Sequence, residues 1–534
     1  MRRTSRMNRK TLVLPAVVGL LAPVLVACGS TESGGGDAMV VGTTDRITVG
    51  EDSPAPLDPA FAYDTGSWNV LRQTLQTLMH APRGGGAPVP DAAQSCDFTD
   101  NASQSYRCKL RSGLKFSDGS AVTAEDVKFS IERIIGINDR NGAAALLSNV
   151  DTIEVKSERE IVFHLKTPDA TFPFKLSTPA AAIVSKKKYD AAKLRDGLQV
   201  DGSGPYTMKT QAEKGDVSKV VFSRNKHYTG DIDLRNDKVE LRVFPDSGAM
   251  RRALEKGEID VATRELSAAH IKEMLDNQSK DVKLTELPGL SIQYLAFNTD
   301  HPSVKDKAVR QAMATLIDRG QIAGQVYNAT AEPLYSLIPA SVGAHKNAFY
   351  NKYGDPSITK ARSTLRDAGI STPVEVTIHY ASDRYNAKEY EVIRDQLNRS
   401  GLFKATAKGT DKWSAFRAAG QRGDYAVYGL GWVPDFPDPD NYIAPFLEKD
   451  NFLGSPYVSA EARKLIPQSR RQADRTAAAE TFARLQQIVA EDVPVLPLWQ
   501  GKQYVASRKG INGVERLLNG SSDLQLWELD NSGN

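Results

Sequence analysis

The stretch that most constrains the fold is Tyr425–Tyr442, which has the sequence YAVYGLGWVPDFPDPDNY. Its first half alternates as a short buried strand does, with Tyr425, Val427 and Gly429 on one side. Its second half cannot continue a sheet, because prolines at positions 434, 437 and 439 each lack a backbone donor. The sequence therefore predicts a buried strand that ends in a stiff loop.

This loop carries an aromatic ring, Trp432, and a carboxylate, Asp435. In open α/β sheets, ligands bind in the crevice beyond the carboxyl ends of the strands. A ring and a carboxylate held there suit an organic ligand with a positive charge, so Asp435 is a candidate to meet the α-amino group of a peptide. Aspartate beside proline is also ordinary turn chemistry, which is the alternative for Asp435 and our interpretation of Asp438 and Asp440.

The N-terminal 27 residues have the features of an export signal. Five basic residues within the first ten precede a mostly apolar run, residues 11–26, which is short for a membrane-spanning helix. The run leads into Leu25–Gly29 (LVACG), which resembles a bacterial lipobox and implies cleavage before Cys28 and lipidation of its thiol. The alternative is an ordinary signal peptide followed by a chance cysteine. Residues 28–45, rich in Gly, Ser and Thr, are predicted to be a flexible tether.

Removal of residues 1–27 changes the formal net charge from +3 to −2, since it removes five basic and no acidic residues. The nearly neutral remainder gives no argument for a nucleic-acid partner. The full length of 534 residues allows roughly three domains of ~150 residues. We see no internal repeat and no second apolar segment long enough to span a membrane.

Two further cysteines, Cys96 and Cys108, flank a segment that reads as a turn. Export would place both in an oxidising compartment, so a hairpin disulfide is the first prediction. Two free thiols or a pair of metal ligands are the alternatives, although the sequence contains no CxxC motif. No cofactor or metal site is predicted.

Strands and helices alternate along the rest of the chain, which is typical of an α/β fold. Helices are predicted at residues 68–80, 123–135, 247–256, 305–319, 387–399 and 478–489, the second opening with a capping box at Thr123. Strands are predicted at 46–50, 106–115, 161–165, 241–244, 291–298 and 374–380. The turn Asp201–Tyr206 (DGSGPY) lacks the lysine of a P-loop and precedes a strand, so phosphate binding is not expected there.

Several of these segments together resemble the extracytoplasmic solute-binding proteins of family 5, the peptide, dipeptide and nickel-type receptors of ABC importers. The matching segments follow the family's order over nearly the whole exported chain, and 114–127 is the most specific of them. They are the lipobox, Leu57–Ala60 (LDPA), Cys108–Ile135, Asp201–Tyr206, Tyr294–Thr299 (YLAFNT), Val309–Arg319, Gly429–Tyr442 and Val493–Trp499 (VPVLPLW).

The resemblance implies an α/β fold with two lobes, the periplasmic-binding-protein-like fold of type II in its large cluster C form. Its hinge would be two crossing segments, with Tyr294–Thr299 and Val493–Trp499 at the crossings. Lobe I would take residues 46–288 and 494–534, and lobe II residues 289–493. The implied function is a monomeric binding component of an ABC importer, which captures peptides and docks on a permease. The ATPase would be another chain, since no GxxxxGK[ST] motif occurs.

The resemblance also assigns residues to the ligand. Asp435 matches the family's aspartate that pairs with the peptide amino terminus. The segment Gly431, Trp432 and Val433 matches the strand edge that bonds to peptide backbone.

The resemblance involves two more segments. It places Tyr63, Asp64 and Thr65 near the other strand that would sandwich the ligand. Arg384, in the segment DRYN, is the candidate for the ligand carboxylate, with a solvated loop arginine as the alternative.

Three other functions stay open. The same fold could bind a nickel chelate, an opine or an oligosaccharide, or could serve as a surface signalling or adhesion protein. An exported lipoprotein hydrolase ranks lower, because neither G-x-S-x-G nor H-E-x-x-H occurs and the seven histidines are scattered singly.

Overall fold

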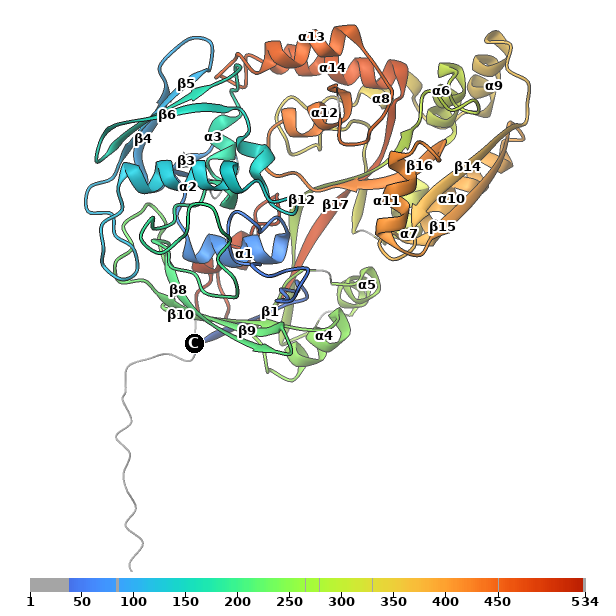
Figure 1. The fold of residues 1–534 in the computed structure, drawn as a ribbon. Helices are drawn as coiled ribbons and strands as arrows, with labels where there is room; N and C mark the ends of the chain where they lie inside the picture. The colour runs from blue at the N-terminus through green and yellow to red at the C-terminus, as the bar shows by residue number, and fades with distance from the viewer. Residues whose placement is uncertain are drawn as a thin grey trace, which may run out of the picture. The chain divides into compact units, whose positions relative to one another are not determined.

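Two long antiparallel strands, β12 (Val282–Phe297) and β17 (Val495–Arg508), run side by side through the middle of the compact unit Ala38–Asn534 (Figure 1). This computed structural model describes residues 38–82, 86–264, 266–277, 279–328, 330–449 and 451–531. The predicted signal peptide (1–27) and Cys28 lie outside the described residues. Among those described, no helix combines the length and the apolar character needed to cross a membrane.

Within the described residues, β12 and β17 form the centre of an eleven-stranded sheet in the order β15-β14-β16-β12-β17-β11-β1-β10-β9-β8, with β13 paired to β17. The other strands of this sheet are β1 (Met39–Thr43), β8 (Tyr206–Glu213), β9 (Asp216–Arg224), β10 (Lys238–Val243), β11 (Val261–Ala262), β13 (Ala331–Pro333), β14 (Val374–Ala381), β15 (Phe403–Thr410) and β16 (Val427–Trp432).

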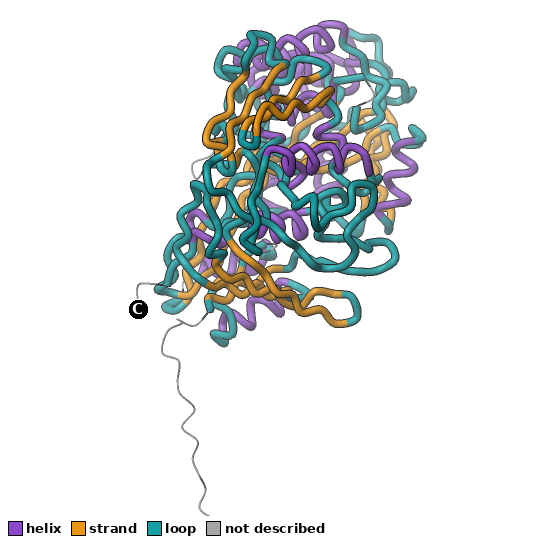
Figure 2. Tube along the Cα trace, turned by 60° about the vertical axis from the view of Figure 1, so that its left-hand side comes forward, coloured by secondary structure: helices purple, strands orange, loops and turns teal. Residues whose placement is uncertain are grey.

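A second sheet of four antiparallel strands has the order β4-β5-β7-β6, and its strands form a separate group in Figure 2. Its strands are β4 (Ala93–Phe98), β5 (Ser105–Leu110), β6 (Val150–Ser157) and β7 (Glu160–Leu165), with the small pair β2 (Met79–His80) and β3 (Val89–Pro90) beside it. Cys96 and Cys108 are direct partners across β4 and β5 and form a disulfide, with Cα atoms 4.1 Å apart. The prediction of a hairpin disulfide is confirmed.

The helices begin mostly at Asp, Ser or Asn caps. They are α1 (Thr65–Thr74), α2 (Ala124–Ile137), α3 (Phe172–Lys175), α4 (Ser247–Glu255), α5 (Ala268–Asp276), α6 (Lys307–Leu316), α7 (Arg319–Val326), α8 (Ala348–Tyr353), α9 (Ile358–Asp367), α10 (Ala387–Arg399), α11 (Trp413–Gln421), α12 (Asp440–Leu447), α13 (Ala460–Ser469) and α14 (Ala479–Asp492). At α2 the predicted capping box is present, since the Asp126 carboxylate accepts from the backbone N–H of Thr123 at 3.0 Å.

Two large hydrophobic cores divide the described residues into lobes. One core draws on residues 39–287 and 505–529, the first lobe, and the other on residues 290–498, the second lobe. The chain re-enters the first lobe later than the predicted residue 494, because Val495, Leu496 and Leu498 pack in the second core. The predicted crossing segments, 294–299 and 493–499, likewise belong mainly to the second lobe.

The tether prediction (28–45) is wrong at its end. Met39–Thr43 forms β1, which pairs in parallel with β10 and β11, and its Val41 is completely buried. The strand expected at 46–50 makes only isolated bridges, at Thr48 and Gly50. The composition of this segment, rich in Gly and Thr, did not indicate a strand. The partner strands, β10 and β11, lie about 200 residues later in the sequence.

Helix α1 is shifted from its predicted range, 68–80. It begins at Thr65 because the Asp64 carboxylate caps it, accepting from the Ser67 backbone N–H at 2.9 Å. It ends at Thr74, whose carbonyl accepts from the backbone N–H of Gly204 at 3.0 Å. A Cβ at Gly204 would lie 2.4 Å from the Thr74 backbone, so the DGSGPY turn packs against a helix end.

Candidate ligand-binding site

The loop that carries Asp435 joins β16 to α12 and is held by two ion pairs. Asp438 binds Arg475 through both carboxylate oxygens, each at 2.7 Å. Asp440 binds Arg470 in the same way, at 3.0 Å and 3.0 Å. The interpretation of these two aspartates as turn residues only is therefore incomplete, because each neutralises a partly buried arginine, 30 residues later for Asp440 and 37 residues later for Asp438.

Among the described residues, only neutral groups donate hydrogen bonds to the Asp435 carboxylate. The hydroxyl of Tyr63, from the first lobe, donates to its Oδ1 at 2.7 Å, and the side-chain amide of Asn441 donates to its Oδ2 at 3.2 Å. The backbone N–H of Asp435 donates in turn to Asn441 Oδ1 at 2.9 Å, which fixes the direction of the carboxylate. The contact with Tyr63 therefore joins the two lobes directly at the predicted site.

The electrostatic state of Asp435 follows from these contacts. Burial raises the pKa of its carboxyl, and the hydrogen bonds from Tyr63 and Asn441, with the charge of Lys175, offset only part of the shift. Burial, followed by the charge of Asp435, raises the pKa of the Tyr63 hydroxyl well above its ordinary value. Tyr63 is thus a neutral donor at every physiological pH.

Asp435 and Tyr63 line a cleft of about 220 Å³ to which both lobes contribute. The predicted residues along it are Tyr63, Asp64, Thr65, Trp432, Val433 and Asp435. Of these residues, Asp64 also caps the N-terminus of α1. The ring of Tyr63 packs against that of Trp68, with centroids 5.4 Å apart. The geometry thus brings together six of the eight residues predicted for the ligand.

Gly431 and Arg384 are not among the residues that line this cleft. The backbone N–H of Gly431 donates to the hydroxyl of Tyr385 at 3.0 Å. Arg384 is exposed, and its guanidinium lies 4.4 Å from the ring centroid of Trp413. No carboxylate among the described residues pairs with Arg384.

The cleft also has residues that the sequence did not single out for a ligand: Trp68, Asn69, Pro434, Ser521 and Asp523. Ser521 and Asp523 come from the C-terminal segment, which carried no recognisable motif. Trp68 could have been found only by knowing that α1 starts at Thr65, next to the cleft.

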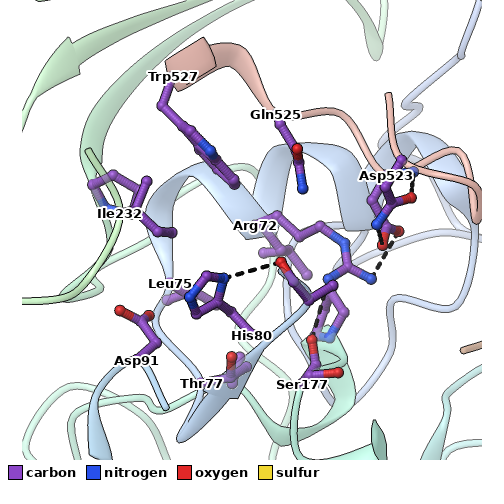
Figure 3. Close-up of a pocket in the computed structure, with 16 residues that line it drawn as sticks. Arg72, Leu75, Thr77, His80, Asp91, Ser177, Ile232, Asp523, Gln525 and Trp527 are labelled. Carbon is purple, nitrogen blue, oxygen red and sulfur yellow. Dashed lines mark hydrogen bonds and ion pairs between the residues drawn. The ribbon is translucent and has the colours of Figure 1, made fainter. Parts of the chain in front are cut away.

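Arg72 lies behind Asp523, on the side of a small inner cavity of about 40 Å³ (Figure 3). Its guanidinium forms an ion pair with Asp523 at 2.8 Å and donates to the Ser177 carbonyl at 3.1 Å. The charge of Asp523 is thereby compensated from within the first lobe.

Two α/β lobes, joined by a pair of long strands and contributing to one cleft, define the class of two-lobed solute-binding proteins, in which a ligand is held between the lobes.

Comparison with known proteins gives the family. The model of the bacterial extracellular solute-binding proteins, family 5 Middle, matches residues 87–454, more than half of the chain, and the chain belongs to this family. A dipeptide-binding protein of Pseudomonas aeruginosa is 26% identical over 505 residues, covering 88% of this chain and 92% of that protein. The oligopeptide-binding protein OppA of Bacillus subtilis is 22% identical over 508 residues, covering 89% and 91%. The family predicted from the sequence is confirmed.

Solved structures confirm the fold class. The periplasmic binding protein DppA of Helicobacter pylori, in complex with the peptide STSA, is 22% identical with a TM-score of 0.73, covering 93% of this chain and 98% of that one. The binding protein AgaA of A. tumefaciens, in complex with agropinic acid, is 21% identical with a TM-score of 0.70, covering 92% and 96%. Both show the shared two-lobed α/β fold.

Proposed function

We propose that this chain captures short peptides outside the cytoplasm and delivers them to the permease of an ABC importer. The α-ammonium group of the peptide would bind the Asp435 carboxylate in the cleft between the lobes. Relatives named as dipeptide-binding and oligopeptide-binding proteins support a peptide ligand. The ATPase of the importer would be a separate chain, and the binding protein a monomer.

One observation carries the proposal. Asp169, Asp438 and Asp440, which lie around the loop, each have a lysine or arginine nitrogen within 3.0 Å. Among the described residues, Asp435 accepts hydrogen bonds only from the Tyr63 hydroxyl and the Asn441 amide, and Lys175, whose charge also acts on it, is paired with Asp169. A buried carboxylate without a cation is costly, and a ligand ammonium would supply both the charge and strong hydrogen bonds.

The test combines a variant with a modified ligand. Asp435→Asn should weaken the binding of a tripeptide by tenfold or more in calorimetry, which corresponds to at least about 1.4 kcal/mol. N-acetylation of the tripeptide should weaken its binding to the wild-type protein similarly, and should add little in the variant. Asp355→Asn, an exposed carboxylate in the same lobe that does not line the cleft, is the control. Unchanged affinity for the acetylated peptide would favour another solute, such as an opine, a nickel chelate or an oligosaccharide.

For Arg384 we propose a contact with the carboxylate of short peptides. Its guanidinium is stacked on Trp413 and lacks a carboxylate partner among the described residues, so it is oriented and available. Arg384→Gln should weaken the binding of a dipeptide with a free carboxylate severalfold and leave its C-terminal amide unaffected. An equal effect on both forms would mark Arg384 as a solvated loop residue.

For Cys28 we propose cleavage of residues 1–27 and lipidation of the new N-terminus, which would anchor the protein to the membrane. The motif LVAC supports this assignment. Mass spectrometry of the protein from membranes should give a chain that begins at Cys28 and carries acyl groups. An unmodified Cys28, or release of the chain into the medium, would contradict the anchor.

A further inference from the structure

The cleft wall has an excess of negative charge. The described residues that line it include three carboxylates, Asp64, Asp435 and Asp523, and no lysine, arginine or histidine. Arg72 compensates Asp523 from behind, at 2.8 Å (Figure 3). Two carboxylates therefore face the cleft without an ion pair to any described residue, and they come from opposite lobes.

Asp64 uses only part of its hydrogen-bonding capacity. Its Oδ1 accepts from the Ser67 backbone N–H at 2.9 Å, which caps α1, and the side chain is exposed. Its Oδ2 accepts no hydrogen bond from a described residue. One oxygen thus holds the helix, and the other can accept from a group that enters the cleft, which Asp64 lines.

Ser521 gives an independent indication of a ligand group on this wall. Its side chain lines the cleft, the residue is only 8% exposed, and its Oγ has no hydrogen-bond partner among the described residues. A buried hydroxyl without a partner is costly, so a polar group that enters the cleft would be stabilised beside it.

Two tryptophan side chains also line the cleft. Trp68 and Trp432 line the same cleft, one from each lobe. An alkyl chain that ends in a cation packs well on such rings, and the cation itself is attracted to an indole face.

We infer that the preferred ligands are peptides with a basic side chain, whose charged end lies against Asp64 and Ser521. This inference rests on the proposed function, since it assumes that the α-ammonium occupies Asp435. A peptide with neutral side chains supplies one positive charge to the two carboxylates that lack an ion pair, whereas a lysine or arginine peptide supplies two.

The experiment compares lysine with norleucine, which has an alkyl side chain and no amine. Calorimetry is run with Ala-Lys, Lys-Ala and their norleucine counterparts. The better lysine peptide should bind at least tenfold more tightly than its counterpart. Asp64→Asn should reduce this ratio to about twofold or less, because it lowers the affinity for the lysine peptide far more than that for its norleucine counterpart, while asparagine still caps the helix as well as aspartate does. Ser521→Ala should lower the ratio in part.

The outcomes separate this inference from the proposed function. Equal affinities for lysine and norleucine peptides, or a preference that survives in Asp64→Asn, would overturn the inference alone, provided that N-acetylation still weakens binding by tenfold or more. Binding that is indifferent to N-acetylation, or no binding of any of these peptides, would overturn the proposed function and this inference with it.

Discussion

Three aspartates within six positions of one loop differ in what surrounds their charge. Asp438 and Asp440 are each bound to an arginine, Arg475 and Arg470, through both oxygens. Of the described residues, a tyrosine and an asparagine alone donate hydrogen bonds to the Asp435 carboxylate, through a hydroxyl and an amide. The loop is thus fixed by two paired carboxylates, so that the third is presented to the cleft at little further cost in side-chain entropy.

Ligand affinity should depend on pH through Asp435. Burial raises the pKa of its carboxyl, so Asp435 takes up a proton at a higher pH than an ordinary aspartate does. The protonated form cannot pair with an ammonium group. The affinity for peptides should therefore fall as the pH is lowered from about 7 to about 4, with proton release on binding at the lower end. Calorimetry at several pH values measures both.

In the variant Asp435→Asn the affinity should be weak and nearly independent of pH over the same range. An unchanged pH profile in this variant would show that another group titrates, and would remove Asp435 from the binding site.

At the residue level, the sequence alone predicted those site residues that lie within one motif. Asp435 and Trp432 follow directly from a strand that ends at prolines. The partners of the loop, Arg470 and Arg475, and the cleft residues Ser521 and Asp523 could not be found in this way. Their roles depend on contacts between segments 30 to several hundred positions apart, which no local pattern encodes.

Among the elements, those with strong periodicity were predicted best. The helix at Ala387–Arg399 was predicted with the bounds that the structure has, and the strand at Val374–Ala381 to within one residue. Strand β12 was expected at eight residues and has sixteen, because its first half belongs to the other lobe. A strand that passes between two cores changes its burial pattern midway, so its full length is not visible as one alternation.

The crossing between the lobes depends on the close approach of β12 and β17. A Cβ at Gly289 would lie 2.3 Å from the carbonyl oxygen of Gly501, a backbone atom that cannot move alone. Gly289→Ala should therefore lower the free energy of unfolding by about 1–3 kcal/mol, as overpacking does, and should weaken peptide binding. Urea denaturation and calorimetry measure the two effects.

Gly501→Ala provides the matched control for this prediction. A Cβ there would lie 2.7 Å from the Ser291 hydroxyl, a side-chain atom that can rotate away. Its loss of stability should be clearly smaller, and equal losses in the two variants would argue against a tight backbone contact at Gly289.

The hairpin β4–β5 depends on its cross-link. Replacing both Cys96 and Cys108 by serine opens a loop with a sequence separation of 12 residues. The chain-entropy model gives a loss of about 3 kcal/mol in the free energy of unfolding, measurable by urea denaturation. Peptide affinity should not change, since neither cysteine lines the cleft. A stable reduced protein, or a loss of affinity without a loss of stability, would contradict this assignment.

For the whole molecule, contacts between the lobes determine how closed the cleft is. Besides Tyr63 and Asp435, the backbone N–H of Ala170 donates to the Arg470 carbonyl at 2.8 Å. Phe174, from the first lobe, stacks on Phe436, from the second, with centroids 5.7 Å apart. Phe436 lies in the loop that presents Asp435, and Arg470 binds Asp440 at the end of that loop, so closure and ligand binding should be linked.

Phe174→Ala should shift the protein toward an open arrangement of its lobes. An aromatic pair contributes about 0.5–1.5 kcal/mol. Without this pair, a larger part of the binding free energy is needed to close the lobes, so peptide affinity should fall by roughly two- to tenfold. Small-angle X-ray scattering should give a larger radius of gyration without peptide and the wild-type value at saturation. Tyr350→Ala removes an exposed ring that pairs with Tyr335 inside the second lobe, and should change neither quantity. If Phe174→Ala lowers affinity without a change in the radius, its effect is on the local cleft wall, and the stack does not control closure.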